Sequence, residues 1–197
     1  MFANFTPSSV HTNTMSDTHD LNAPAGWVRR HMNLIPNGGR VLDLAAGRGR
    51  HSRILLAAGH TVTAADRNVE GLSELAGQQR LEIVAVDLEA ESWPFGMEEF
   101  AGIVVVNYLH RPLFGHLTDS LRDGGVLIYQ TFAAGNEAYG RPKNPDFLLQ
   151  PGELLDAFTP ALTVIAYQHG IVQRPEPAVI QRLCAVKSAP PQTLAED

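Results

Sequence analysis

Cysteine is almost absent from this 197-residue chain, long apolar runs are missing, and basic residues are fewer than acidic ones. The single cysteine, Cys184, cannot form an intramolecular disulfide, so oxidative crosslinking plays no part in the fold. No segment approaches the ~20 continuous apolar residues of a membrane-spanning helix. The formal net charge of -6 argues against a basic nucleic-acid-binding surface, because neutralising phosphates requires clustered Lys and Arg.

Metal-site spacing and targeting signals are missing as well. The eight histidines and the cysteine show neither an H-x-x-x-H nor a C-x-x-C spacing, so we expect no metal site. The polar first residues lack the basic start and apolar run of a secretory signal. We therefore expect a flexible N-terminal tail at 1–21, with Met15 as an alternative start, one cytoplasmic domain at 22–187 without membrane contact, and a C-terminal tail at 188–197.

Strand-like and helix-like segments alternate along the predicted domain. The apolar, strand-like segments are 40–45, 61–66, 81–87, 101–108, 125–132, 161–172 and 177–188. The helix-like segments are 23–34, 50–59, 69–79, 111–125 and 151–158. This alternation predicts an α/β fold with a Rossmann-like, doubly wound, mostly parallel seven-stranded sheet. Because no helix separates the last two strands, we expect them to form a C-terminal antiparallel hairpin.

The first predicted strand and its turn, VLDLAAGRGRHS, contain the clearest candidate for a ligand-binding loop. Gly47 and Gly49 would let the backbone approach a ligand at the carboxyl end of the sheet, although a pair of glycines also suits a simple tight turn. Asp43 lies inside the strand, where an acid needs a partner. Its carboxylate would accept a hydrogen bond from an ammonium group or order the loop. Asp66, which ends the next strand, suits two ribose hydroxyls, with a cap or turn role as the alternative.

A nicotinamide-dependent oxidoreductase is the weaker interpretation of the same loop. The dinucleotide fingerprint G-x-G-x-x-G would place its third glycine at position 52, which is Ser52 here. An acid inside the strand is also not part of that fingerprint. We therefore keep this class only as an alternative.

The segment VLDLAAGRGRHS resembles the first motif of class I S-adenosyl-L-methionine (SAM)-dependent methyltransferases, with Ala45 where the family's first glycine usually lies. The resemblance implies that Asp66 binds the ribose of SAM and that Asp87-Leu88 faces the adenine. It also implies that the methyl group is presented near Asn107-Tyr108. The cofactor site that it implies comprises Asp43, Ala45, Gly47, Gly49, Asp66, Arg67, Asp87, Leu88 and Asn107.

Three further segments, DLEAESWPF, VVVNYLHRPLF and TFAAGNEAYGRPKNPDFLLQPGELL, are similar to a narrower group of small bacterial tellurite-resistance-type methyltransferases. Together with the first motif, this resemblance covers about 42–158. It implies a SAM-dependent methyltransferase whose acceptor is a small molecule or is carried by a peptide. The fourth strand ends in Asn-Tyr-Leu-His rather than the Asn-Pro-Pro-Tyr type of motif found in enzymes that methylate nucleic-acid amino groups. No nucleic-acid substrate is therefore expected.

A cluster of cations, Arg48, Arg50, His51 and Arg53, surrounds the start of the helix predicted at 50–59. The helix dipole already favours negative charge there, so the cluster predicts an anionic ligand such as the methionine carboxylate of SAM. The alternative is that these arginines extend into solvent.

The candidate catalytic residues are Asn107, Tyr108 and His110. His110 would serve as a base, given an ordinary pKa near ~6.5, or as a helix-start or packing residue. Arg111 would bind an acidic acceptor or pair with a surface carboxylate. Thr131 is a further substrate-facing candidate, whereas core packing competes with such a role for Tyr129.

The long polar segment 133–150, called the lid segment below, is predicted to fold over the acceptor. Asn136, Tyr139 and Arg141 are its candidate substrate contacts. A domain that binds SAM without transferring the methyl group remains an alternative function. The oligomeric state is left open.

Overall fold

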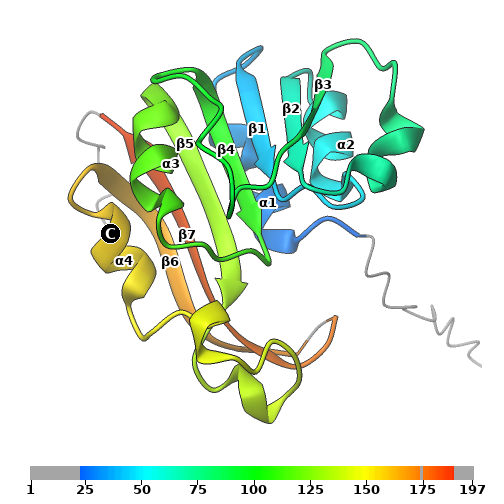
Figure 1. Ribbon diagram of the computed structural model, residues 1–197. Coiled ribbons are helices and arrows are strands. Elements are labelled where there is room, and N and C mark those ends of the chain that lie inside the picture. Colours follow the sequence, from blue (N-terminus) through cyan, green and yellow to red (C-terminus); the bar gives the residue numbers. More distant parts are fainter. Residues whose placement is uncertain (1–22, 174, 189–197) are drawn as a thin grey trace, which may run out of the picture.

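The computed structural model describes residues 23–173 and 175–188 (Figure 1). One seven-stranded sheet runs through the molecule, with strand order β3-β2-β1-β4-β5-β7-β6. Its strands are β1 (Arg40–Leu44), β2 (Thr61–Asp66), β3 (Leu81–Ala85), β4 (Phe100–Val106), β5 (Leu121–Phe132), β6 (Leu162–Val172) and β7 (Ala178–Lys187). The tail expected at 1–21 lies outside the described residues, as does the tail expected at 188–197 apart from Ser188.

Eight short helical elements precede or connect the described strands. The α-helices are α1 (Gly26–His31), α2 (Arg50–Ala57), α3 (Leu113–Ser120) and α4 (Glu153–Phe158). The 3-10 helices are η1 (Met32–Leu34), η2 (Val69–Leu75), η3 (Asn136–Ala138) and η4 (Pro145–Phe147). In the described part of the chain, no helix combines the length and hydropathy of a membrane-spanning segment.

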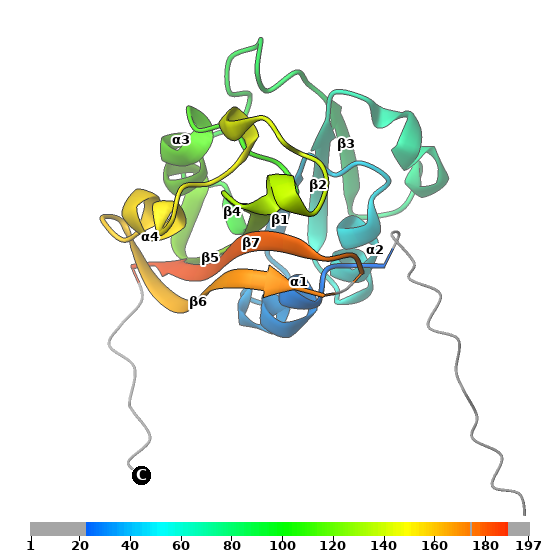
Figure 2. The ribbon, with the colours of Figure 1, turned by 90° about the horizontal axis from the view of Figure 1, so that it is seen from below.

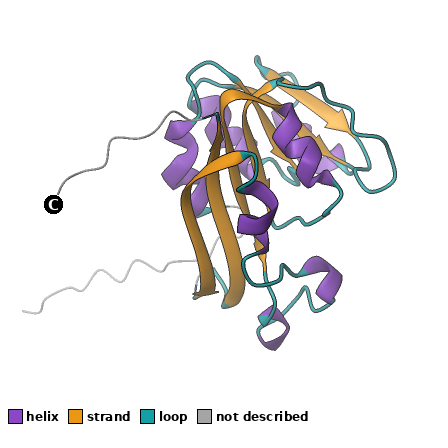
Figure 3. Cartoon of the chain, turned by 90° about the vertical axis from the view of Figure 1, so that its left-hand side faces the viewer, coloured by secondary structure: helices purple, strands orange, loops and turns teal. Residues whose placement is uncertain are grey.

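Alternate residues of the central strands pack on opposite faces of the sheet, as the two-residue strand period requires. On one face, Leu42 and Ile103 join a core cluster with side chains of α3 and α4. On the other face, Val41 and Val104 pack with side chains of α1 and α2. Figure 3 shows these helices on both sides of the sheet. Strands covered on both faces explain why β4 is buried along its whole length.

Strands β1 to β5 pair in parallel, whereas β7 pairs antiparallel with both β5 and β6. The predicted doubly wound sheet with a C-terminal antiparallel hairpin is therefore confirmed. Parallel pairing places the carboxyl ends of β1, β2, β4 and β5 along one edge of the sheet, which faces downward in Figure 1 and toward the viewer in Figure 2. The lid segment lies along this same edge.

Two predicted helices differ from the observed structure. The segment predicted as a helix at 69–79 is the short 3-10 helix η2, in which Gly71 packs so closely that an added Cβ would lie 2.9 Å from the Gly47 carbonyl oxygen. The helix predicted at 111–125 ends at Ser120. Leu121 already pairs with Phe100 in the sheet, and the two glycines that follow form an irregularity in the strand instead of a helix cap.

Candidate cofactor and acceptor site

The loop between β1 and α2 is held in an unusual backbone conformation. Ala45, Gly47 and Gly49 all have positive φ, at 54°, 58° and 72°. The Gly47 N–H donates a 2.8 Å hydrogen bond to Oδ2 of Asp66, and the Asn68 N–H donates to Oδ1 over 2.9 Å. Backbone donors therefore orient both carboxylate oxygens of Asp66 at the end of β2, beside the loop.

Gly49 serves packing rather than ligand contact. An added Cβ would lie only 2.5 Å from Leu75 and 2.9 Å from Leu72, so a larger residue would push η2 away from the loop. Gly47 has no such neighbour within 4 Å and lines a cavity. The two glycines therefore have different roles. Gly47 borders a cavity, whereas Gly49 allows η2 to pack closely against the loop.

Asp43 lies beneath the loop and is 1% exposed. Its Oδ2 accepts a 2.6 Å hydrogen bond from the Ser52 hydroxyl. Burial raises the pKa of Asp43 to about 7, against the opposing effect of the Ser52 hydrogen bonds. Because Asp43 lines none of the four cavities described below, its geometry fits the loop-ordering alternative and not a direct contact with an ammonium group.

His51 connects Asp43 to the N-terminal end of the described chain. Its Nε2 accepts a 3.2 Å hydrogen bond from the Ala25 N–H, so the ring proton is on Nδ1, which lies 3.9 Å from Oδ1 of Asp43. Burial, with Arg50 as the second cause, lowers the pKa of His51 to about 4. Since the pKa of Asp43 is raised to about 7, the two groups face each other as neutral partners between these values and not as an ion pair.

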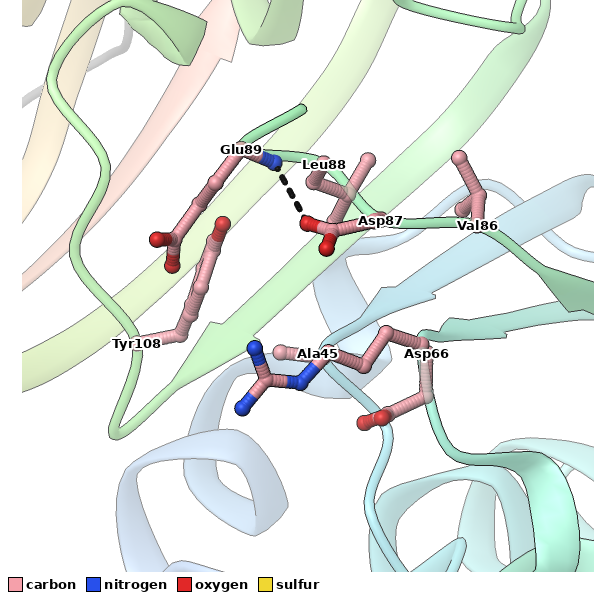
Figure 4. A pocket seen from close by; sticks show the side chains of 8 residues that line it. Ala45, Asp66, Val86, Asp87, Leu88, Glu89 and Tyr108 are labelled. Carbon is pink, nitrogen blue, oxygen red and sulfur yellow. Dashed lines mark hydrogen bonds between the residues drawn. The ribbon is translucent and has the colours of Figure 1, made fainter. Parts of the chain in front are cut away.

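The first cavity, the carboxylate pocket, has a volume of about 250 Å³. Figure 4 shows the Asp66 side chain on one side of it, Asp87 and Leu88 on another, and the Tyr108 ring facing them. The structure thus brings six predicted residues together here. The pocket is lined by Ala45, Asp66, Arg67, Val86, Asp87, Leu88, Glu89 and Tyr108.

The second cavity, the loop pocket, has a volume of about 860 Å³ and shares Ala45 with the first. All four members of the predicted cluster line it, so the cluster faces a cavity, but His51 is uncharged at neutral pH because its pKa is lowered, and the arginines carry the positive charge. One of them, Arg53, is paired with Glu74 at 2.8 Å. The loop pocket is lined by Ala45, Ala46, Gly47, Arg48, Arg50, His51, Arg53, Glu70, Gly71, Ser73, Glu74, Val106 and Asn107.

Asn107, the residue after β4, stands where three cavities meet. It lines the loop pocket and two further cavities, the hairpin pocket and the aromatic pocket. Its backbone has a φ of 59°, and its N–H is fixed by a 2.9 Å hydrogen bond to the Gln130 carbonyl oxygen. Asn tolerates this left-handed conformation better than most residues, which accounts for its occurrence at this sharp strand exit.

The aromatic pocket, of about 220 Å³, shares Tyr108 and Glu89 with the carboxylate pocket. The Tyr108 hydroxyl is buried and has no hydrogen-bond partner among the described residues. Burial, followed by the charges of Glu89 and Asp87, raises the pKa of Tyr108 to about 12, so the phenol is a hydrogen-bond donor at neutral pH. The pocket is lined by Glu89, Asn107, Tyr108, Leu109, Thr131, Phe132, Pro142 and Phe147.

The hairpin pocket has a volume of about 390 Å³ and lies between the lid segment, the β6–β7 hairpin and the segment that leads into α1. The three predicted lid residues, Asn136, Tyr139 and Arg141, all line it. Asn136 is 1% exposed, and its side chain bonds to the Pro142 carbonyl oxygen and the Val179 N–H, each at 3.2 Å. Asn136 therefore also fixes the lid segment to β7.

Arg111 has a structural position that differs from the predicted acceptor contact. Its guanidinium bonds to the Glu153 carboxylate at 2.6 and 3.0 Å and to the carbonyl oxygens of Asp146 and Leu148 at 2.7 and 2.9 Å. Burial would raise the pKa of Glu153, but hydrogen bonds from Arg111 and the Gln150 N–H leave it lowered. Arg111 thus pairs with a carboxylate, which was the alternative interpretation. Through these bonds it links the lid segment to α4.

The other candidates near the strand ends also differ in whether they line a cavity. Thr131 lines the aromatic pocket, although it is almost fully buried. His110 lines none of the four cavities, and its carbonyl oxygen accepts the Leu113 N–H at the start of α3, as in the helix-start alternative. Tyr129 is a core residue that donates a 3.0 Å hydrogen bond to the Tyr108 carbonyl oxygen.

Comparison with known families adds a match that spans more than half of the chain. The model of the tellurite resistance protein TehB matches residues 11–113. The chain belongs to the TehB family. No curated protein sequence matches it.

Solved structures that resemble the chain place this TehB-family member in a wider fold group. TehB from Haemophilus influenzae aligns with a TM-score of 0.69 at 18% identity, covering 83% of this chain and 62% of that protein. A TehB-like SAM-dependent methyltransferase from Corynebacterium glutamicum aligns with a TM-score of 0.60 at 19% identity, covering 82% and 87%. The chain therefore has the fold of SAM-dependent methyltransferases, and it spans less than two thirds of the Haemophilus protein.

A third similar structure is 1,6-didemethyltoxoflavin-N1-methyltransferase from Burkholderia thailandensis, solved with 1,6-didemethyltoxoflavin and S-adenosylhomocysteine (SAH) bound. It aligns with a TM-score of 0.62 at 22% identity, covering 83% of this chain and 76% of that one.

The pockets of this TehB-family chain fit SAM by their chemistry. Asp66 and Asp87 offer carboxylate oxygens, which accept hydrogen bonds from hydroxyl and amine groups, and Leu88 offers an apolar surface. The arginines of the loop pocket suit a carboxylate. The unpartnered Tyr108 hydroxyl, buried between two cavities, is the kind of polar atom that a ligand satisfies.

Proposed function

We propose that this chain transfers a methyl group from SAM to a small-molecule acceptor or one carried by a peptide. The observation that carries the proposal is the adjacency of the cavities. The carboxylate and loop pockets share Ala45, and the loop, hairpin and aromatic pockets share Asn107. Cavities suited to SAM thus lie beside cavities suited to an acceptor. The small-molecule substrate of the Burkholderia enzyme supports the same size class.

In this proposal the predicted cofactor residues act from fixed positions. Asp66, already oriented by two backbone N–H donors, accepts hydrogen bonds from the ribose hydroxyls. Asp87 faces the adenine amine while Leu88 packs against the ring, and Arg67 borders the same pocket. The cations of the loop pocket hold the methionine carboxylate.

When bound, SAM supplies a methyl group on a good leaving group, so the chain mainly has to align the acceptor and exclude water. Asn107 stands at the meeting point of the cavities and orients the acceptor there. The phenol of Tyr108 keeps its proton at neutral pH and acts as a hydrogen-bond donor, not as a base. A base is unnecessary for an acceptor that is already unprotonated, and His110 lines none of these cavities.

The test is calorimetric titration of the purified chain with SAM, SAH and NADH, followed by methyl transfer from isotopically labelled SAM to a panel of small acceptors. We expect SAM and SAH to bind, NADH not to bind, and at least one acceptor to gain label. Binding of NADH alone would support the oxidoreductase alternative. Binding of SAH without transfer to any acceptor would support the non-catalytic SAM-binding domain.

A further inference from the structure

The net charge of the side chains that line the hairpin pocket is positive, opposite in sign to the net charge of the chain. Among the described residues, its charged lining consists of Arg50, Arg141, Arg182 and Glu176. These arginines come from three separate elements, α2, the lid segment and β7. The chain as a whole has a formal net charge of -6, so this excess of cations is a local property of the pocket.

Arg182 is held in place at the wall of this pocket. Its Nε donates a 2.8 Å hydrogen bond to Oε1 of Gln168, and its guanidinium lies 4.8 Å from the centre of the Trp27 ring. Both partners are uncharged. Burial, followed by the nearby charge of Arg30, lowers the pKa of Arg182, so the protein itself disfavours a cation here.

No carboxylate of the described chain lies within ion-pair distance of Arg141 or Arg182. Arg182 is partly buried, so the absence of a counter-charge is costly there, and a bound anion would remove that cost, whereas Arg141 is exposed and adds charge from the lid segment. The two side chains therefore present positive charge to whatever occupies the pocket.

The remaining walls of the pocket are largely apolar. Phe132 and Ile180 contribute from the sheet, Val172 from the hairpin and Tyr139 from the lid segment. The volume of about 390 Å³ lies within the roughly 300–1,000 Å³ typical of small-molecule sites. A bare inorganic oxyanion would leave most of such a cavity unfilled, whereas an organic body would pack against these side chains.

We propose that the methyl acceptor is a small organic anion. Its charged group contacts Arg141 and Arg182, and its apolar body packs against Phe132 and Ile180. Asn107, which lines both this pocket and the loop pocket, places the opposite end of the acceptor beside the cofactor site. This inference rests on the proposed function and assigns a substrate class to it.

The experiment uses the full chain saturated with SAH and follows ligand binding by NMR. The probes are matched acid and amide pairs, namely phenylacetate with phenylacetamide, indole-3-acetate with indole-3-acetamide, and hexanoate with hexanamide, together with inorganic phosphate. We expect at least one acid to bind about tenfold more tightly than its amide. Arg141→Gln and Arg182→Gln should each reduce that preference several-fold, Glu176→Gln should increase it, and Arg122→Gln, which changes an arginine outside the pocket, should leave it unchanged.

Equal affinity for acid and amide in every pair would overturn the proposal, and so would a preference that survives loss of both arginines. If phosphate bound as tightly as the best organic acid, the proposal that the pocket recognises an organic body would be overturned. Arg141 is exposed, so its variant should fold even where Arg182→Gln does not. SAH binding, measured in the same samples, separates the two ideas: failure to bind SAH contradicts the proposed function, whereas SAH binding without acid preference contradicts only this inference.

Discussion

The Gly47 N–H donates its hydrogen to Asp66 Oδ2 across 2.8 Å and thereby joins the loop after β1 to the end of β2. The loop lines the loop pocket through Gly47, and Asp66 lines the carboxylate pocket. One hydrogen bond thus ties together the two cavities that the proposed function assigns to the two ends of SAM. A change at Asp66 should disturb both.

Replacing Asp66 with Asn should weaken SAH binding about 10- to 100-fold. The amide retains one oxygen acceptor, so the N–H of Gly47 or Asn68 loses its partner, and the charge-assisted bonds to a ribose are lost as well. Hydrogen bonds to charged groups contribute roughly 1.5–3 kcal/mol each. Calorimetry measures the change, with Glu82→Gln, an exposed acid outside all four cavities, as the control. Unchanged affinity in Asp66→Asn would remove Asp66 from the cofactor site.

The Asp43–His51 contact predicts opposite pH dependences in two variants. The folded-state pKa of Asp43 is raised from 3.8 to about 7, so its contribution to the free energy of unfolding falls as pH rises between these values. The folded-state pKa of His51 is lowered from 6.5 to about 4, so its contribution rises with pH over that range. The two contributions oppose each other in the parent protein, each with a slope of about 1.4 kcal/mol per pH unit.

Urea denaturation at a series of pH values separates these contributions. Relative to the parent protein, Asp43→Asn should gain stability as pH rises from about 4 to 6.5, whereas His51→Gln should lose it from about 4 to 7. Parallel profiles for the three proteins would mean that neither group has a strongly shifted pKa in the folded chain.

The parts of the fold that sequence predicted are those governed by local periodicity and strand order. Continuous apolar runs identified the parallel strands, and the missing helix between the last two strands identified the hairpin. The polar residues at the strand ends could also be predicted from the sequence, because parallel strands must bring Asp66, Asp87 and Asn107 to one edge of the sheet. The resemblance marked position 45 as unusual, and the structure shows why a glycine is preferred there: Ala45 adopts a φ of 54°, which costs a non-glycine residue about 1–2 kcal/mol.

The residues that sequence missed reach their pockets through contacts distant along the chain. Arg182 lies in the middle of β7, lines the hairpin pocket, and contacts Gln168 and Trp27, which are distant along the chain. Glu89 follows the recognised Asp87-Leu88 pair by one position, but nothing local showed that it borders two cavities. The sequence left Arg111 either as an acceptor contact or as the partner of a carboxylate. The carboxylate that it binds belongs to Glu153, which is 42 residues away along the chain.

Replacing Arg111 with Met should release the lid segment from α4. The substitution keeps an unbranched apolar stem but removes the bonds to Glu153 and to two lid carbonyl oxygens. We expect a loss of about 1–3 kcal/mol in the free energy of unfolding and faster proteolysis within 133–150, with SAH affinity retained. Glu153→Gln is the matched partner variant and should show a smaller change in the same direction. A lid segment that stays protected in Arg111→Met would show that other contacts hold it.

Two tyrosines offer a matched test of the buried, unpartnered hydroxyl. Tyr108→Phe removes a hydroxyl that has no partner among the described residues, so the free energy of unfolding should stay constant or rise by up to about 1 kcal/mol. Tyr129→Phe removes the donor of a 3.0 Å bond to the Tyr108 carbonyl oxygen and should cost about 1 kcal/mol. Methyl transfer should fall about tenfold in Tyr108→Phe, because the hydroxyl then cannot donate to a bound ligand. If Tyr108→Phe instead lost stability like Tyr129→Phe and kept full transfer activity, the hydroxyl would have a structural partner and no role at the site.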